Sequence, residues 1–84
     1  MSTQAPFFAA ANRVLRMYEL RQQQITRRAP HSQTEIEWAA DLLLGLAGAA
    51  AFSASKEAVS LRDAAEYWKR YGKQPDFFPE TIEA

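Results

Sequence analysis

Cysteine is absent from this 84-residue chain, and histidine occurs only once. Without thiols there are no disulfide bonds, thiolate metal sites or cysteine nucleophiles, and the composition suits a reducing compartment. The one histidine, His31, is the sole candidate for a triad base or an imidazole metal ligand. No G-x-S-x-G motif, P-loop or dinucleotide-binding glycine motif occurs. We therefore predict no catalytic residues, no metal site and no cofactor, and a protein that is not an enzyme.

A net charge of either sign is also missing, because ten basic residues balance ten acidic ones. A non-specific nucleic-acid binder needs accumulated positive charge, so this balance argues against one. The charges are nevertheless uneven along the chain. Residues 1–31 hold five arginines and one acidic residue, Glu19, whereas residues 32–84 hold five basic and nine acidic residues. The basic segment can lie over the acidic ones within the chain, or it can orient a partner.

Long hydrophobic runs are missing as well. The longest uncharged stretch, residues 42–55, is shorter than the roughly 18 residues that suggest a membrane span. The N-terminal segment lacks the charged and apolar regions of a signal peptide. We therefore expect a cytoplasmic protein without membrane contacts. Because 84 residues make one small domain, 1–84, we expect a marginal core unless a partner or a second copy adds to it.

Helical patterns dominate what is present. No stretch alternates apolar and polar residues for long, so strands are not expected. The periodicity predicts helices at about 6–28, 33–54 and 56–71, followed by a tail at 73–84. Ser32 and Glu35 match a capping box at the start of the second helix, and Gly72 matches a left-handed cap after the third. The predicted fold class is all-α, a small helical bundle in which an antiparallel helical hairpin is joined by a third helix and a packed C-terminal tail.

Two points of this fold stay open. The segments 33–54 and 56–71 can form one continuous helix or two, and we favour a break between Phe52 and Ser60. The tail carries two adjacent phenylalanines, Phe77 and Phe78, which are costly to leave in water. They can pack across the domain's own helices or insert into a groove on a partner, and we favour the first alternative.

The second helix is apolar around most of its circumference, which predicts burial by more than one neighbour. One neighbour is the first helix. The other is either the third helix or another copy of the chain, because small residues along this helix permit close approach. We therefore predict a homodimer whose interface contains five residues of this segment: Trp38, Leu42, Gly45, Ala49 and Phe52.

Arginines gather on the first helix around one apolar residue. Arg13, Arg16 and Arg27 share a helical face, and Leu20 lies among them. An apolar residue ringed by arginines suits a protein interface, so we predict protein binding here and at Phe77 and Phe78. The predicted function is that of a small non-enzymatic binding protein, of the kind that bacteria and their viruses encode. It would act stoichiometrically as a regulator, adaptor or inhibitor of a larger protein.

The main alternative is a DNA-binding helical dimer acting as a transcriptional regulator, and nucleic acid is possible as a partner but not favoured. A helix-turn-helix would need a basic recognition helix, whereas Asp63 and Glu66 offset the cations of the third segment. The first helix is the better DNA candidate, although Asn12 and Gln23 are its few polar readers.

A second alternative involves four carboxylates. Glu37 and Asp41 lie four residues apart on one segment, and Asp63 and Glu66 lie three apart on the next. Together they could hold magnesium against a phosphate. The stretch 37–43 resembles the second metal motif of the all-α nucleotide pyrophosphohydrolases, and that resemblance implies magnesium-dependent hydrolysis. It departs from the family because Trp38 stands at the place of a glutamate and because an arginine-rich helix precedes it.

Overall fold

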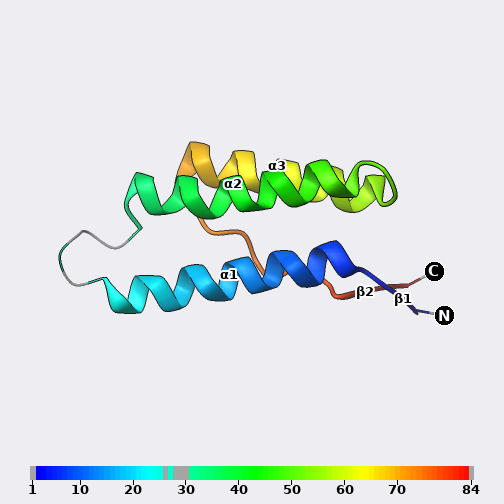
Figure 1. Cartoon of the computed structure of the whole chain (residues 1–84), viewed down its shortest axis with the longest axis horizontal. Helices are drawn as coiled ribbons and strands as arrows, with labels where there is room; N and C mark the ends of the chain where they lie inside the picture. Colours follow the sequence, from blue (N-terminus) through cyan, green and yellow to red (C-terminus); the bar gives the residue numbers. More distant parts are fainter. Residues whose placement is uncertain (1, 26, 28–30, 84) are drawn as a thin grey trace.

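Three helices packed against each other make up most of the part of the chain that the computed structural model describes, residues 2–25, 27 and 31–83. The elements are strand β1 (Ser2–Gln4), helices α1 (Pro6–Gln24), α2 (Gln33–Ala50) and α3 (Ser55–Tyr71), and strand β2 (Thr81–Glu83). Helices α2 and α3 pack closely side by side, and α1 runs along them on one side (Figure 1). The predicted fold class, a small all-α bundle, is confirmed.

Local sequence signals set two of the helix ends as predicted. The Ser32 hydroxyl accepts a hydrogen bond of 3.4 Å from the backbone N–H of Glu35, so it caps α2. Gly72 has a φ of +70°, and its N–H donates to the carbonyl of Trp68 at 2.8 Å. This is the left-handed cap that glycine adopts without a steric penalty from a side chain.

Two helices end earlier than their periodicity suggests. Helix α1 stops at Gln24, not near residue 28, because Ile25 already has an extended backbone. Pro30 predicts a break between the first two helices at residues 29–31, and of these only His31, with a φ of +59°, lies within the described residues. Helix α2 stops at Ala50, not near residue 54, because residues 51–53 turn back and allow α3 to begin at Ser55. The alternative of one continuous helix through this region is therefore wrong.

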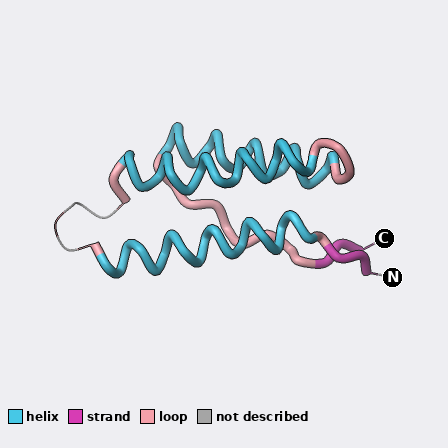
Figure 2. The backbone as a smooth tube through the Cα atoms, in the orientation of Figure 1, coloured by secondary structure: helices cyan, strands magenta, loops and turns pink. Residues whose placement is uncertain are grey.

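The expectation that the chain has no strands is also wrong. Strands β1 and β2 pair antiparallel, with Thr3 opposite Ile82, and the N–H of Ala5 donates to the carbonyl of Glu80 at 2.9 Å. Each strand has only three residues, which is too short for an alternating pattern to stand out. Figure 2 shows that this pairing brings the two chain ends together beside the start of α1.

The core lies where the three helices meet. Its largest buried apolar side chains come from all three, and Tyr18 packs edge-on against Trp68 with ring centroids 4.8 Å apart. Burying a side chain of this size contributes roughly 1.5–3 kcal/mol. Helical periodicity in the segment 56–71 predicts that Leu61, Ala65 and Trp68 face inward, and all three are buried.

The tail packs on its own domain, as the favoured alternative expected. Phe78 stacks on Phe8 at 5.1 Å between ring centroids. The buried side chain of Asn12 accepts from the N–H of Phe78 at 2.8 Å and donates to its carbonyl and to the carboxylate of Glu80, both at 2.9 Å. Asn12 therefore holds the tail, and its assignment as a polar reader of DNA is wrong.

A carboxylate from α3 caps the start of α1. The residue before the helix is Ala5, whose side chain makes no capping bond. The buried Glu57 of α3 accepts a hydrogen bond of 3.1 Å from the N–H of Phe7 instead. Because the N-terminus of a helix carries partial positive charge, this contact stabilises α1 and fixes it against α3.

Candidate protein-binding site

The outer face of α1 carries the residues that the sequence assigned to protein binding. Helical spacing puts Arg13, Arg16 and Leu20 on the side turned away from the core residues Leu15 and Tyr18. All three are exposed, and Leu20 keeps 57% of its surface in contact with solvent. We call these three residues, together with Met17 and Phe77, the arginine face.

Met17 was missed in the sequence and is also exposed on this face. It lies three residues before Leu20, so the two apolar side chains are neighbours on the helix surface. The helical spacing that indicated Leu20 as an exposed apolar residue could therefore also have indicated Met17. Arg27, the other predicted binding residue of this segment, is exposed beyond the end of α1.

The tail adds an aromatic ring at the edge of the arginine face. The guanidinium of Arg16 lies 5.7 Å from the centre of the Phe77 ring, within the range of a cation–π contact. Phe77 stays exposed, whereas its neighbour Phe78 is partly buried against the core. The structure thus brings Phe77 together with the arginines and leaves Phe78 on the inner side of the tail.

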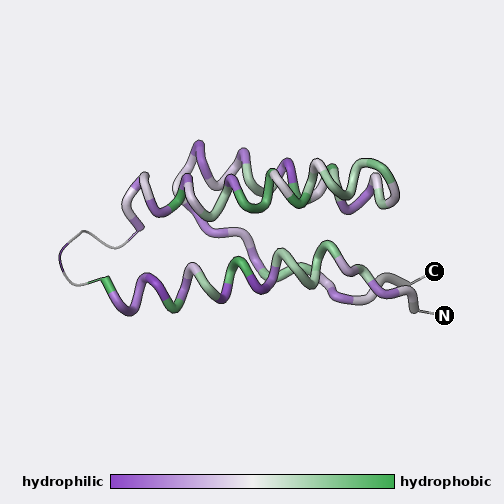
Figure 3. Tube along the Cα trace, viewed as in Figure 1, coloured by the Kyte–Doolittle hydropathy of each residue, from purple (hydrophilic) through white to green (hydrophobic). Residues whose placement is uncertain are grey.

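The five predicted dimer residues occupy a second surface, along α2. Trp38, Leu42, Gly45, Ala49 and Phe52 are all exposed in the single chain. Phe52, in the turn after α2, keeps 94% of its surface in solvent. Figure 3 shows hydrophobic residues running along α2 and into this turn. We call these five residues the α2 face.

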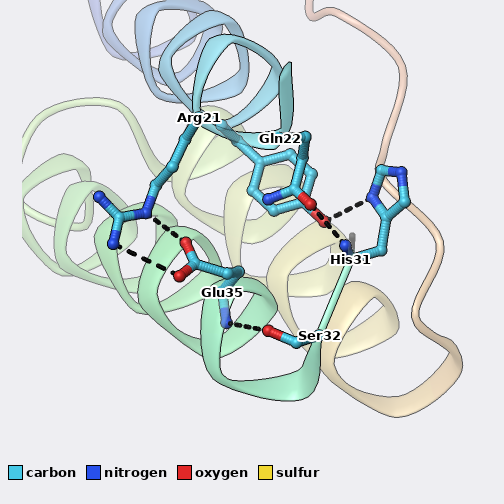
Figure 4. Close-up of polar contacts among 6 residues, drawn as sticks. Arg21, Gln22, His31, Ser32 and Glu35 are labelled. Atoms are coloured by element: carbon cyan, nitrogen blue, oxygen red, sulfur yellow. Dashed lines mark hydrogen bonds and ion pairs between the residues drawn. The ribbon is translucent and has the colours of Figure 1, made fainter. Parts of the chain in front are cut away.

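A buried carboxylate links α1 to the start of α2 (Figure 4). The guanidinium of Arg21 donates to both oxygens of Glu35, with 3.3 Å between Nη2 and Oε1. This hydrogen bond and the charge of Glu35 raise the pKa of Arg21. The same guanidinium lies 5.2 Å from the ring centre of Trp38. Arg21 therefore fixes α1 against α2 and positions one aromatic ring of the α2 face.

His31 serves this junction structurally. Its Nδ1 and the hydroxyl of buried Tyr18 share a hydrogen bond of 2.7 Å, and its backbone N–H donates to the side-chain oxygen of Gln22. Burial, and then the negative charge of Glu35, raise the pKa of Tyr18. The backbone φ of His31 is +59°, an uncommon value for a residue with a side chain.

The four carboxylates of the magnesium hypothesis do not converge. In the part of the chain that the structure describes, no three or more histidine, aspartate or glutamate residues are grouped to hold a metal ion. Asp41 accepts a 2.6 Å hydrogen bond from the ammonium of Lys69, and this bond raises the pKa of Lys69. Asp63 and Glu66 share a surface hollow with Lys69 and Arg70. The expected juxtaposition is therefore wrong, because cations intervene.

Comparison with known proteins identifies no relative: no protein-family model, curated protein or solved structure matches the chain. Among the described helices, none is both long enough and apolar enough to cross a membrane. The candidate sites are therefore defined by the residues of this chain alone.

Proposed function

We propose that this protein is a small, non-enzymatic binding protein that acts stoichiometrically on a larger protein through the arginine face. The observation that supports this proposal is the position of Leu20, exposed at the middle of a face that also holds two arginines and two further apolar side chains. Exposed apolar groups rimmed by polar ones characterise protein-interaction sites. Arginine and aromatic residues are also enriched among the residues that contribute most to such interfaces.

The chemistry of the face indicates the surface that it fits. Leu20 and Met17 would enter an apolar depression on the partner, and Arg13 and Arg16 would pair with carboxylates around its edge. Arg16 already has a fixed neighbour in Phe77, so less side-chain entropy is lost when it binds. The proposed partner is thus a protein with an acidic rim around an apolar depression. We propose a cytoplasmic location for this chain, because a composition without cysteine suits a reducing compartment.

A duplex DNA fits this face less well. The four described arginines of the N-terminal segment are exposed, but Arg21 is paired with Glu35, and the apolar Met17 and Leu20 lie between the others. The phosphates of DNA make no favourable contact with those apolar side chains, and the net charge of the chain is zero. A gel-shift titration with duplex DNA at several salt concentrations separates the two functions. Tight binding with a steep salt dependence would contradict the proposal.

The direct test uses tagged full-length chain to capture partners from a lysate, with three forms compared in parallel. They are the wild type, Leu20→Asp, and Val59→Asp, which alters an exposed apolar residue on α3. Circular dichroism first establishes that each variant is folded. We expect a captured protein that Leu20→Asp loses and Val59→Asp retains. Arg16→Glu combined with Arg27→Glu should lose it as well, because two exposed arginines of the N-terminal segment then carry negative charge.

Equal capture by the wild type and by the folded Leu20→Asp variant would contradict the proposed site. Loss with both single variants would also contradict it, since the binding surface would then extend to α3.

A further inference from the structure

We propose that two copies of this chain associate through the α2 face, with their α2 helices antiparallel and crossing at Gly45. Positions 38, 42, 45, 49 and 52 are separated by alternating steps of four and three residues. A step averaging 3.5 residues is the spacing with which one helix packs against another along a seam. All five residues are exposed, although Arg21 of α1 lies against one side of the Trp38 ring. The occupant that this spacing fits is another helix.

Gly45 supplies independent support for a close approach. A Cβ atom added at Gly45 would meet no heavy atom within 4 Å, so the single chain has no steric need for glycine there. Glycine in the interior of a helix lowers its stability relative to alanine. The missing side chain becomes useful when a second backbone approaches, because two helices can then cross with little between them.

The arrangement of side chains around Gly45 favours a second copy as the occupant. Trp38 precedes Gly45 by seven residues and Phe52 follows it by seven. Leu42 precedes it by three and Ala49 follows it by four. An antiparallel pair with its two-fold axis at Gly45 therefore sets Trp38 against Phe52 of the second copy, and Leu42 against Ala49. Such a surface is self-complementary, as a two-fold interface requires. Each aromatic ring faces an aromatic ring of the second copy, and each leucine faces an alanine.

The charges beside α2 favour the antiparallel orientation. Glu37 and Asp41 are exposed in the N-terminal half of α2, although Asp41 also pairs with Lys69 of the same chain, whereas residues 42–50 of the helix carry no charge. Beside that second half, Arg62 of α3 borders the same groove as Leu44 and Gly48. Antiparallel pairing puts the acidic half of each helix beside the half that Arg62 flanks. Parallel pairing would put the two acidic halves together.

Two features prepare the aromatic anchors of this interface. Arg21 stacks on one side of the Trp38 ring, which still exposes 37% of its residue surface. Phe52 extends from a turn whose backbone is fixed by hydrogen bonds of Ser53 and Ala54 to the carbonyl of Ala50, at 3.1 and 2.7 Å. Aromatic residues held in this way contribute strongly to interfaces. The arginine face lies on the far side of α1 from the core, so it stays free in the pair.

The first test is the absolute mass in solution, measured by light scattering on a sizing column across a dilution series. One chain has a mass of 9.5 kDa, and the inference predicts twice that value, falling towards it only on strong dilution. Gly45→Arg should give the single-chain mass at every concentration while the chain stays folded, because nothing surrounds position 45 in the single chain. Tyr67→Glu, an exposed aromatic residue on α3, serves as the matched control and should keep the double mass.

The second test uses the absence of native cysteine, so that a disulfide can form only between introduced thiols. A disulfide needs Cα atoms within roughly 4.4–6.8 Å of each other. Under mild oxidation, Gly45→Cys should cross-link with itself. Leu42→Cys mixed with Ala49→Cys should give the mixed disulfide, and neither of these two variants should cross-link alone.

Several outcomes would overturn the inference. A single-chain mass at all concentrations contradicts the association, and a mass above two chains contradicts a closed pair. If folded Gly45→Arg keeps the mass of two chains, the chains associate through a surface other than the α2 face. Self-linking of Leu42→Cys alone shows a parallel pair. These outcomes leave the arginine face untouched, so they do not bear on the proposed function.

Discussion

Asn12, Glu35 and Glu57 are buried polar residues, and each contacts a segment far from it in the sequence. Asn12 holds the tail, Glu35 holds α1, and Glu57 caps α1 from α3. A buried polar group without a partner costs about 1–3 kcal/mol, so each contact both satisfies a polar group and fixes the position of an element. These single side chains determine how the elements that carry the two surfaces are placed.

Replacement of Asn12 by alanine should release the tail. Three hydrogen bonds to residues 78 and 80 are lost, and we expect the free energy of unfolding to fall by about 2 kcal/mol. Amide hydrogen exchange should become faster at Phe78. Gln23→Ala, an exposed change on the same helix, is the control and should change stability by less than about 0.5 kcal/mol. Unchanged exchange at Phe78 would show that Asn12 does not hold the tail.

Glu35→Ala should weaken the junction between α1 and α2. The carboxylate is 2% exposed and accepts from Arg21, which is itself half exposed, so solvent reduces the loss to about 1–2 kcal/mol. Glu37→Ala, an exposed carboxylate two residues further along the same helix, should cost less than about 0.5 kcal/mol. Urea unfolding of the two variants measures the difference. Equal losses would contradict the structural role of Glu35.

Ionisation of Tyr18 should lower the stability of the fold at alkaline pH. Its pKa is raised above the ordinary value of 10.0, mainly by burial, so the folded state holds the phenolic proton more tightly than the unfolded state. The stability that this difference contributes is complete below pH 10.0 and is lost as the pH rises through the folded pKa. Tyr18→Phe should therefore show a smaller fall in unfolding free energy above that pH. Identical pH profiles would contradict this origin.

At the scale of the elements, the helices were predictable where the signals are local. Ser32 and Gly72 mark a helix start and a helix end within four residues of chain, and both were recognised. The strands and the contact of Phe78 with Phe8 were not foreseen, because each joins residues more than sixty positions apart. Helical periodicity predicts an apolar stripe on the first helix made of Phe7, Ala11, Val14, Leu15, Tyr18, Gln22 and Ile25. Phe8 and Asn12 lie outside that stripe and are buried because the tail covers them.

Replacement by alanine should change the stability of the fold in opposite directions at Gly48, within α2, and at Gly72, directly after α3. A Cβ at Gly48 meets nothing within 4 Å, so Gly48→Ala should raise the free energy of unfolding by about 0.5–1 kcal/mol. Gly72 has a φ of +70°, which costs about 1–2 kcal/mol for a residue with a side chain, so Gly72→Ala should lower it. Thermal or urea unfolding measures both. A destabilising Gly48→Ala would indicate a contact at that position within the single chain.

At the scale of the whole molecule, the chain is an elongated body of 46 × 20 × 18 Å with two outward faces. The arginine face lies on α1 and the α2 face lies on the helix across the core (Figure 1). Helical spacing in the sequence singles out Leu20, the arginines and the residues of the α2 face, but it did not include Met17 and did not show that Phe77 joins Arg16 or that Phe78 turns inward. The positions of Phe77 and Phe78 depend on where the tail crosses α1, and helical periodicity does not indicate the path of the tail.

The central claim is stoichiometric binding through the arginine face, and a calorimetric titration of a captured, purified partner tests it most directly. We predict saturation at one chain for each partner molecule and no binding heat with folded Leu20→Asp. A full effect on the partner at far fewer chains than partner molecules would contradict stoichiometric action. Unchanged binding of Leu20→Asp would contradict the site.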